Sequence, residues 1–100
     1  MKIVGAVAAA AHYLLEFTPT LMTKVVVYSK PGCCLCDEVK AQLTKLREKH
    51  PFELRELNIL DDPEIYEEFK EEIPVVFING RKAFKYRLDE RKFLKMIGDL

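Results

Sequence analysis

The feature that most constrains this chain is the tetrad Cys33-Cys34-Leu35-Cys36, which lies between a β-branched run and an amphipathic segment. The run Val25-Val26-Val27-Tyr28 predicts a buried strand, and the residues after Cys33 predict a helix. A cysteine at the start of a helix meets unpaired backbone N–H groups and the positive end of the helix dipole, which favour the thiolate form. Cys36 follows about one turn later on the same face. The spacing therefore predicts a thiol–disulfide site in which one thiol attacks and the other resolves.

The size and the cysteine content limit the class of protein. A chain of 100 residues with 49% hydrophobic residues suffices for one domain with its own core. Its three cysteines all lie within four residues, whereas the bridges of secreted proteins join distant segments. We therefore expect a reducing, cytoplasmic setting. Sixteen basic and sixteen acidic residues cancel, so the net charge gives no attraction to nucleic acid or to an anionic membrane.

Charge is nevertheless distributed unevenly along the chain. Residues 61–72 carry seven acids against one lysine, and residues 81–95 carry seven bases against two acids. Runs of this kind usually form solvated faces, and we interpret both in that way. The alternative is that the basic run helps to select substrates, through Lys82, Lys85, Arg87 and Arg91.

Residues 1–22 differ from the rest of the chain, and we treat them as an extension ahead of a domain at residues 23–100. Residues 3–11 are apolar and faintly resemble a secretory signal, but they are fewer than the roughly 20 residues that cross a bilayer. Met22 is an alternative start, because Thr23 leads directly into the first strand. The favoured interpretation is a helix at residues 4–16, or a frayed segment, with no part in the chemistry. No membrane attachment is expected.

The segments after the tetrad show clear helix and strand patterns. Apolar residues recur every three or four positions between Cys33 and His50, which predicts an amphipathic helix. Residues 52–59 resume strand character, and the alternation slips in their middle, which predicts a bulge or a change of burial. Asp62-Pro63 predicts a helix start, and this helix is expected to end by Ile73 because a proline follows.

A hairpin and a last helix complete the predicted order. Asn79-Gly80 is the preferred two-residue turn between strands at residues 75–78 and 81–86. Asp89 is the expected N-cap of a helix that Gly98 ends. The order βαβ-α-ββα predicts an α/β fold, a four-stranded mixed sheet with helices on both faces. The apolar run that precedes the tetrad is expected at the centre of this sheet, buried on both sides.

With these elements in place, the chain closely resembles the glutaredoxin branch of the thioredoxin superfamily, and its small C-x-L-C members in particular. The resemblance rests on the order of elements over residues 24–97, on Tyr28-Ser29-Lys30-Pro31-Gly32-Cys33 with Cys36, and on Ile73-Pro74-Val75-Val76-Phe77-Ile78-Asn79-Gly80. It implies a thioredoxin-like fold and a dithiol oxidoreductase that acts on disulfide-containing proteins or glutathione adducts. A thiol reductant, with glutathione as a candidate, would supply electrons, and no resident cofactor is expected. We expect a monomer.

The resemblance also implies roles for individual residues. Cys33 is the implied attacking thiol and Cys36 the resolving one, and no metal is involved. Lys30 matches the basic residue that family members direct at a carboxylate of glutathione. The Ile73-Pro74 bond is implied to be cis and near the cysteines, with Ile73 presenting backbone groups to an extended substrate. The predicted site therefore combines two catalytic and three substrate-binding residues.

Two departures from the family pattern concern the substrate site. Glutaredoxins usually carry Thr-Val-Pro where this chain has Glu72-Ile73-Pro74, which places an acid at the edge of the site. After the hairpin they carry a Gly-Gly pair where this chain has Phe84-Lys85. Glycine admits a close backbone contact that a side chain blocks, so the γ-glutamyl end of glutathione loses its usual contact.

Other interpretations remain open at this stage. Cys34 is interpreted as a bystander, because adjacent residues of a helix face away from each other, and a vicinal or mixed disulfide is the alternative. Three thiols could hold zinc or an iron–sulfur cluster shared between chains, but a closed zinc site needs four ligands, and His12 and His50 lack the spacing. For the whole domain, the competing hypothesis is a thioredoxin-fold module that binds partners or delivers a metal or cluster without turnover.

Overall fold

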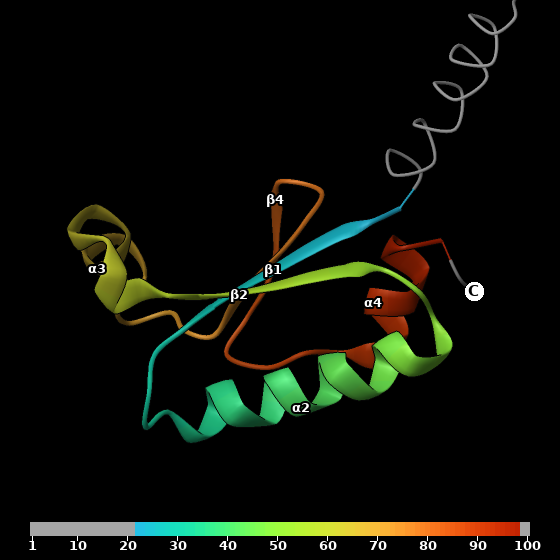
Figure 1. Ribbon diagram of the computed structural model, residues 1–100, viewed down its shortest axis with the longest axis horizontal. Helices are drawn as coiled ribbons and strands as arrows, with labels where there is room; N and C mark the ends of the chain where they lie inside the picture. Colours follow the sequence, from blue (N-terminus) through green and yellow to red (C-terminus); the bar gives the residue numbers. More distant parts are fainter. Residues whose placement is uncertain (1–21, 99–100) are drawn as a thin grey trace, which may run out of the picture.

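The computed structural model describes residues 22–98, so residues 1–21 of the predicted extension lie outside the described residues. The order of elements is the predicted one, with a short 3-10 helix added after the second strand (Figure 1). The elements are β1 (Lys24–Ser29), α2 (Cys34–Lys49), β2 (Glu53–Asn58), η2 (Ile59–Asp61), α3 (Pro63–Phe69), β3 (Val75–Ile78), β4 (Arg81–Lys85) and α4 (Glu90–Met96).

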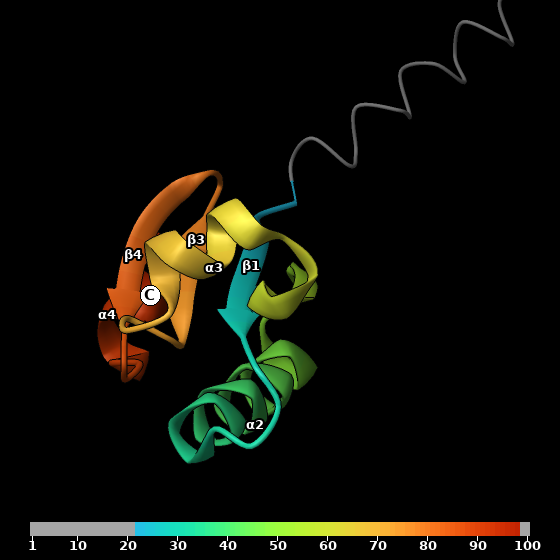
Figure 2. The ribbon, with the colours of Figure 1, turned by 90° about the vertical axis from the view of Figure 1, so that its left-hand side faces the viewer.

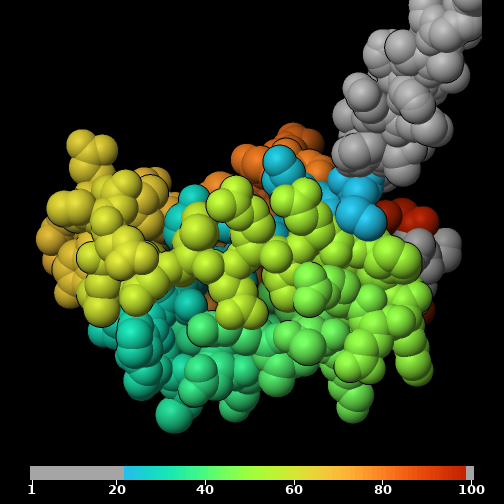
Figure 3. Space-filling view, in the orientation of Figure 1, coloured from blue at the N-terminus to red at the C-terminus, as the bar shows by residue number. Residues whose placement is uncertain are grey.

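The strands form one mixed sheet in the order β2-β1-β3-β4, which confirms the predicted central position of β1. β1 pairs in parallel with β2, and its other edge pairs antiparallel with β3. Because the pair is parallel, the C-terminal ends of β1 and β2 lie at the same end of the sheet. The C-terminal end of β1 leads into α2, the helix that carries the cysteines. β2 is an edge strand, and Figure 3 shows its side chains and those of α2 forming one continuous face of the domain.

The larger hydrophobic cluster, here called the main core, lies between the sheet and two helices. α2 and α4 lie on the same side of the sheet (Figure 1). Leu43 of α2 and Phe93 of α4 are completely buried there against the valines of β1. The main core consists of Val25, Val27, Val39, Leu43, Phe52, Val76, Ile78, Leu88 and Phe93.

The smaller cluster, here called the cysteine cluster, lies where α3 covers the opposite face. In Figure 2, α3 crosses in front of β1 and β3, whereas α2 lies below the strands. The ring of Phe69 lies 5.2 Å from that of Tyr28, centroid to centroid. Since α3 has only seven residues, it covers this face incompletely, and Val26 and Tyr28 are half-buried. The prediction that β1 is buried on both sides is therefore wrong for this face. The cluster consists of Cys36, Ile59, Phe69, Ile73 and Val75.

The irregularity expected in the second strand is a change of burial and not a bulge. β1 and β2 keep an unbroken register from Lys24–Glu53 to Ser29–Asn58. Because β2 is an edge strand, its outer residues need no strict alternation, and Leu57 is exposed. The register shift of this sheet lies instead between β3 and β4, where Ala83 is the extra residue. The shift allows both Ala83 and its neighbour Phe84 to contact the main core.

The predicted turns and caps are confirmed. Asn79 and Gly80 both have positive φ, 51° and 84°, as the tight hairpin turn requires. Asp62 caps α3 by accepting the N–H of Glu64 at 2.9 Å, with Pro63 in the first turn. Asp89 caps α4 by accepting the N–H of Lys92 at 3.1 Å. These short polar contacts set where the two helices begin, and thereby which residues each turns towards the sheet.

The last strand ends one residue earlier than predicted. β4 stops at Lys85, and Tyr86 has φ 69°, a left-handed conformation that is rare for an aromatic residue. The N–H of Tyr86 donates to the carbonyl of Pro74 at 2.9 Å, so the chain turns beside the loop between α3 and β3. This turn places the end of β4 beside the loop that contains Ile73 and Pro74.

Candidate active site

Cys33 is the N-cap of α2 and not a residue inside the helix. The loop Lys30-Pro31-Gly32 leads to it from β1, and Gly32 takes φ 78°, which glycine adopts without strain. The Cys33 backbone is extended, and its Sγ accepts the N–H of Cys36 at 3.2 Å. The sulfur therefore occupies the place of a capping oxygen, where a free helix N–H and the helix dipole stabilise negative charge. Cys33 is half-buried, which leaves part of it open to a substrate.

Cys36 lies in the first turn of α2 and is completely buried in the cysteine cluster. The pKa of its thiol is raised from 9.0 to about 11, chiefly by burial and next by the side-chain hydrogen bond with Cys33. A hydrogen bond with the backbone of Lys30 and the charge of Lys40 act against this rise. Cys36 therefore keeps its proton at neutral pH, whereas the sulfur of Cys33 is the acceptor at the helix end.

The structure brings residues 71–74, here called the proline loop, to the cysteines. The Ile73-Pro74 bond is cis, as the family resemblance implied. The side chains of both residues are buried, and Ile73 belongs to the same cluster as Cys36, against which Cys33 also packs. Any contact of Ile73 with a substrate would therefore be through its backbone, whose N–H and carbonyl have no hydrogen bond to the described residues.

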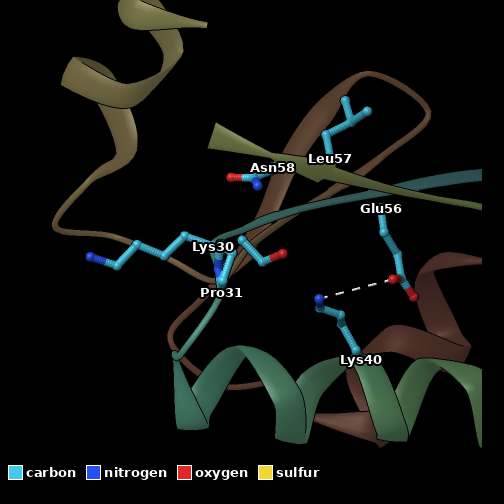
Figure 4. A pocket seen from close by; sticks show the side chains of 7 residues that line it. Lys30, Pro31, Lys40, Glu56, Leu57 and Asn58 are labelled. Atoms are coloured by element: carbon cyan, nitrogen blue, oxygen red, sulfur yellow. Dashed lines mark ion pairs between the residues drawn. The ribbon is translucent and has the colours of Figure 1, made fainter. Parts of the chain in front are cut away.

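Lys30 lies in the loop between β1 and Cys33 and lines a pocket of about 320 Å³. Its side chain extends away from the Lys40–Glu56 ion pair, which spans 4.0 Å between α2 and β2 (Figure 4). Lys30 makes no ion pair with the described residues. It is therefore a cation available to a substrate carboxylate close to the N-terminus of α2. The other residues that line the pocket are Ser29, Pro31, Leu57 and Asn58.

The acid at the edge of the site is neutralised by β4. Glu72 pairs with Lys82, and its hydrogen bond with that lysine lowers the pKa of the Glu72 carboxyl. Of the pair that replaces Gly-Gly, Phe84 packs against the main core, and only Lys85 is exposed. Lys85 lies 5.6 Å, from Nζ to ring centroid, from its exposed neighbour Tyr86, and the obstruction of a close backbone contact stays a prediction.

Sequence reasoning missed Tyr86. Its phenolic O–H donates to the carbonyl of Glu71 at 2.8 Å, and it is 42% exposed. No sequence signal marks it, because a tyrosine after a strand is not expected to turn into the left-handed region. Cys34 is exposed on α2 and does not pack against the cluster that contains Cys36 and contacts Cys33. Its role as a bystander stays a prediction.

Neither a metal-binding cluster nor a membrane-spanning helix occurs among the described residues. Between residues 22 and 98, no group of three or more His, Cys, Asp or Glu side chains is arranged to hold a metal ion. Over the same range, no helix has the length and apolar character needed to cross a membrane.

Known protein sequences resemble this domain over most of its length. Residues 24–98 match the family model described as Glutaredoxin-like domain (DUF836). A glutaredoxin-like protein of Dictyostelium discoideum is 31% identical over 71 residues, which are 65% of this chain and 66% of that protein. An uncharacterized protein of Mycobacterium tuberculosis is 26% identical over 74 residues, which are 69% of this chain and 76% of that protein.

Solved structures show the same fold. The solution structure of protein Ne2328 from Nitrosomonas europaea superposes with a TM-score of 0.67 at 31% identity, covering 75% of this chain and 91% of that one. Mitochondrial thioredoxin 3 of Saccharomyces cerevisiae, in its oxidized form, superposes with a TM-score of 0.59 at 22% identity, covering 87% and 90%. At 22% identity the likeness concerns the fold alone. The predicted thioredoxin-like fold is confirmed.

Proposed function

The chain belongs to the glutaredoxin-like domain family, and from this premise we propose that it is a dithiol oxidoreductase that reduces protein disulfides or glutathione adducts. The observation that carries the proposal is the arrangement of the two thiols. Cys33 is accessible at the N-cap of α2, and Cys36 is buried one turn further, with its N–H directed at the Cys33 sulfur. A nucleophile needs the first environment, and a resolving thiol that waits with its proton needs the second.

The reaction takes two exchange steps. The Cys33 thiolate attacks one sulfur of the substrate disulfide, which forms a mixed disulfide and releases the other sulfur as a thiolate that takes up a proton. Cys36 then gives up its proton and attacks the Cys33 sulfur, which releases the second substrate thiol and leaves a Cys33–Cys36 disulfide. The two electrons that reduce the substrate come from the protein's dithiol. A thiol reductant, glutathione or a reductase system, returns them.

The remaining predicted residues hold the substrate in this proposal. Ile73 offers its unpaired backbone groups to an extended substrate chain, beside Pro74 and above the buried Cys36. Lys30 offers an unpaired cation to a carboxylate near Cys33. We propose further that the protein works as a monomer in the reducing cytoplasm, where a cysteine pair of this kind is kept as a dithiol. Protein disulfides, glutathione adducts and a thiol donor are the proposed partners.

Reduction of insulin and of hydroxyethyl disulfide tests the proposal directly. Cys33→Ser is expected to abolish both reactions, because Cys33 is the accessible thiol whose sulfur accepts the N–H of Cys36 at the N-cap of α2. Cys36→Ser should keep part of the hydroxyethyl disulfide reaction when glutathione is present, since glutathione can then resolve the mixed disulfide. Cys34→Ser is the matched control, because it removes the neighbouring exposed thiol, and its turnover should equal that of the wild type.

The opposite results have a clear meaning. Equal loss in Cys34→Ser and Cys33→Ser would contradict the assignment of the nucleophile. A wild-type protein that reduces neither substrate with any donor, yet holds partners without releasing them on reduction, would replace the proposal with a non-catalytic binding module. Metal analysis and colour of anaerobically purified protein would identify metal or cluster delivery instead.

A further inference from the structure

Tyr86 holds both ends of the loop that carries Ile73. Its backbone N–H donates to the carbonyl of Pro74 at 2.9 Å, and its phenolic O–H donates to the carbonyl of Glu71 at 2.8 Å. One residue therefore contacts the loop on each side of Ile73. The left-handed conformation of Tyr86, φ 69°, turns the chain so that backbone and side chain reach the same loop.

Other residues of the segment at residues 82–87, which contains Tyr86, make two further sets of contacts. Lys82 of β4 pairs with Glu72, in the middle of the loop, and its Nζ lies 5.5 Å from the ring centroid of Phe69. On the other side, Arg87 lies 3.9 Å from Glu38 in the first turns of α2. The segment at residues 82–87 thus contacts both the proline loop and α2, the helix that Cys33 caps.

The side chains of Ile73 and Pro74 are buried, but the backbone of the loop has few other hydrogen bonds. Within it, the N–H of Glu72 donates to the carbonyl of Phe69 at 2.8 Å, and the backbone groups of Ile73 have no partner among the described residues. An extended polypeptide that pairs with Ile73 binds more tightly if the N–H and carbonyl of Ile73 are already fixed in the free protein. Ordering these groups on binding would weaken the affinity. A small disulfide that touches only Cys33 has no such requirement.

We propose that Tyr86 is a positioning residue for polypeptide substrates, because it holds the loop from Glu71 to Pro74 in the shape that presents the Ile73 backbone beside Cys33. The inference rests on the proposed function and narrows it. Tyr86 sets the KM for extended polypeptide disulfides and leaves attack on small disulfides unchanged. It makes no contact with the reacting sulfur atoms in this role.

Tyr86→Phe tests the inference, because it removes only the hydroxyl that bonds Glu71. The matched control is Tyr66→Phe, which removes a hydroxyl that makes no hydrogen bond to the described residues. For a disulfide-linked peptide, the Tyr86 variant should raise KM about three- to tenfold, the range expected for one lost hydrogen bond. Its kcat, its hydroxyethyl disulfide reduction and the pH profile of Cys33 alkylation by iodoacetamide should match the wild type.

Amide hydrogen exchange supplies a readout that does not need activity. The Glu72 N–H should exchange about three- to tenfold faster in Tyr86→Phe, because the loop opens more often, and at the wild-type rate in Tyr66→Phe. Unchanged exchange together with unchanged peptide KM would overturn the inference, and so would an equal loss on peptide and hydroxyethyl disulfides. A wild-type protein that reduces neither substrate would instead overturn the proposed function, and the exchange rate of Glu72 would still decide whether Tyr86 holds the loop.

Discussion

The two hydrophobic clusters of this domain differ in composition and in what they border. The main core lies between the sheet and the helices α2 and α4, and its nine buried residues are all aliphatic or aromatic. The cysteine cluster has five, and one of them is Cys36, an ionisable thiol. Half-buried residues, including Cys33, Tyr28 and Tyr66, complete its boundary. The first cluster is closed by two helices, whereas the second opens towards the candidate active site.

This difference teaches how one small domain separates stability from reactivity. Burying apolar surface stabilises a fold without regard to chemistry, so the larger cluster can be purely hydrophobic. A thiol that must keep its proton until an exchange reaction begins needs a desolvated place beside an accessible partner. The smaller cluster offers that place, because one short helix covers it. Mutations in the two clusters should therefore separate into losses of stability and changes of thiol chemistry.

The largest effect is expected for Phe93→Ala in the main core. Phe93 is completely buried, and its ring packs against that of Phe52 at a centroid distance of 5.2 Å. Removing it should lower the free energy of unfolding by about 3–5 kcal/mol, measured by urea denaturation. In the fraction that stays folded, alkylation of Cys33 should proceed at the wild-type rate. A variant with near-native stability and altered Cys33 reactivity would remove the distinction between the clusters.

The helix caps provide a matched pair of smaller changes. Asp62 caps α3, which covers the cysteine cluster, and Asp89 caps α4, which covers the main core. Each substitution by alanine should lower the free energy of unfolding by about 1 kcal/mol, because each helix loses one side-chain acceptor. Only Asp62→Ala should also increase the alkylation rate of Cys36, since α3 holds Phe69 over that cluster. Equal Cys36 alkylation in the two variants would show that α3 does not protect the thiol.

The buried thiol of Cys36 should make the free energy of unfolding depend on pH in the alkaline range. The raised pKa of Cys36, from 9.0 to about 11, means that the folded state keeps a proton that the unfolded state loses above pH 9. The stabilisation that the protonated Cys36 thiol gives to the fold is complete below pH 9 and declines as the pH rises towards 11. Under reducing conditions, the wild type should lose about 1 kcal/mol more than Cys36→Ala between pH 8 and pH 10. Parallel stability curves for the two proteins would contradict the raised pKa.

The parts of this molecule that could be predicted from sequence are those set by local chemistry. Asp62, Asp89 and the Asn79-Gly80 turn each act within a few residues, so their positions along the chain determine where helices and the hairpin begin. The same holds for Cys33 at the start of α2. The order of these elements then leaves few topologies, and the predicted central position of β1 in a four-stranded mixed sheet is the observed one.

The features that could not be predicted depend on how distant elements meet. The half-burial of Val26 follows from the short length of α3 on that face, and the bulge at Ala83 from the fit of β4 to the main core. The turn at Tyr86 follows from hydrogen bonds to a loop more than ten residues earlier. At the candidate site, sequence indicated the thiols and the proline, but it did not indicate the contacts that hold the proline loop in place.

The smallest expected effect concerns the ion pair that ties this loop to β4. The pKa of Glu72 is lowered, chiefly by its hydrogen bond with Lys82, so the pair stabilises the fold above pH 4.5, the ordinary value, and is lost as the pH falls through the lowered pKa. Both side chains are partly exposed, so added salt should weaken the effect. At low ionic strength, the wild type should be more stable than Glu72→Gln at pH 7, and this difference in the free energy of unfolding should shrink as the pH falls below 4.5.

The control for this measurement is Glu68→Gln, which removes an exposed acid of α3 that has no ion pair with the described residues. Its stability should follow that of the wild type over the same pH range, because the Glu68 carboxylate does not pair with Lys82. Relative to its intrinsic rate, the amide of residue 72 should exchange faster in Glu72→Gln and not in Glu68→Gln, which places the effect in the loop beside the cysteine cluster. A pH-independent difference between wild type and Glu72→Gln would instead assign the loss to packing of the side chain, and the loop would then depend on Tyr86 alone.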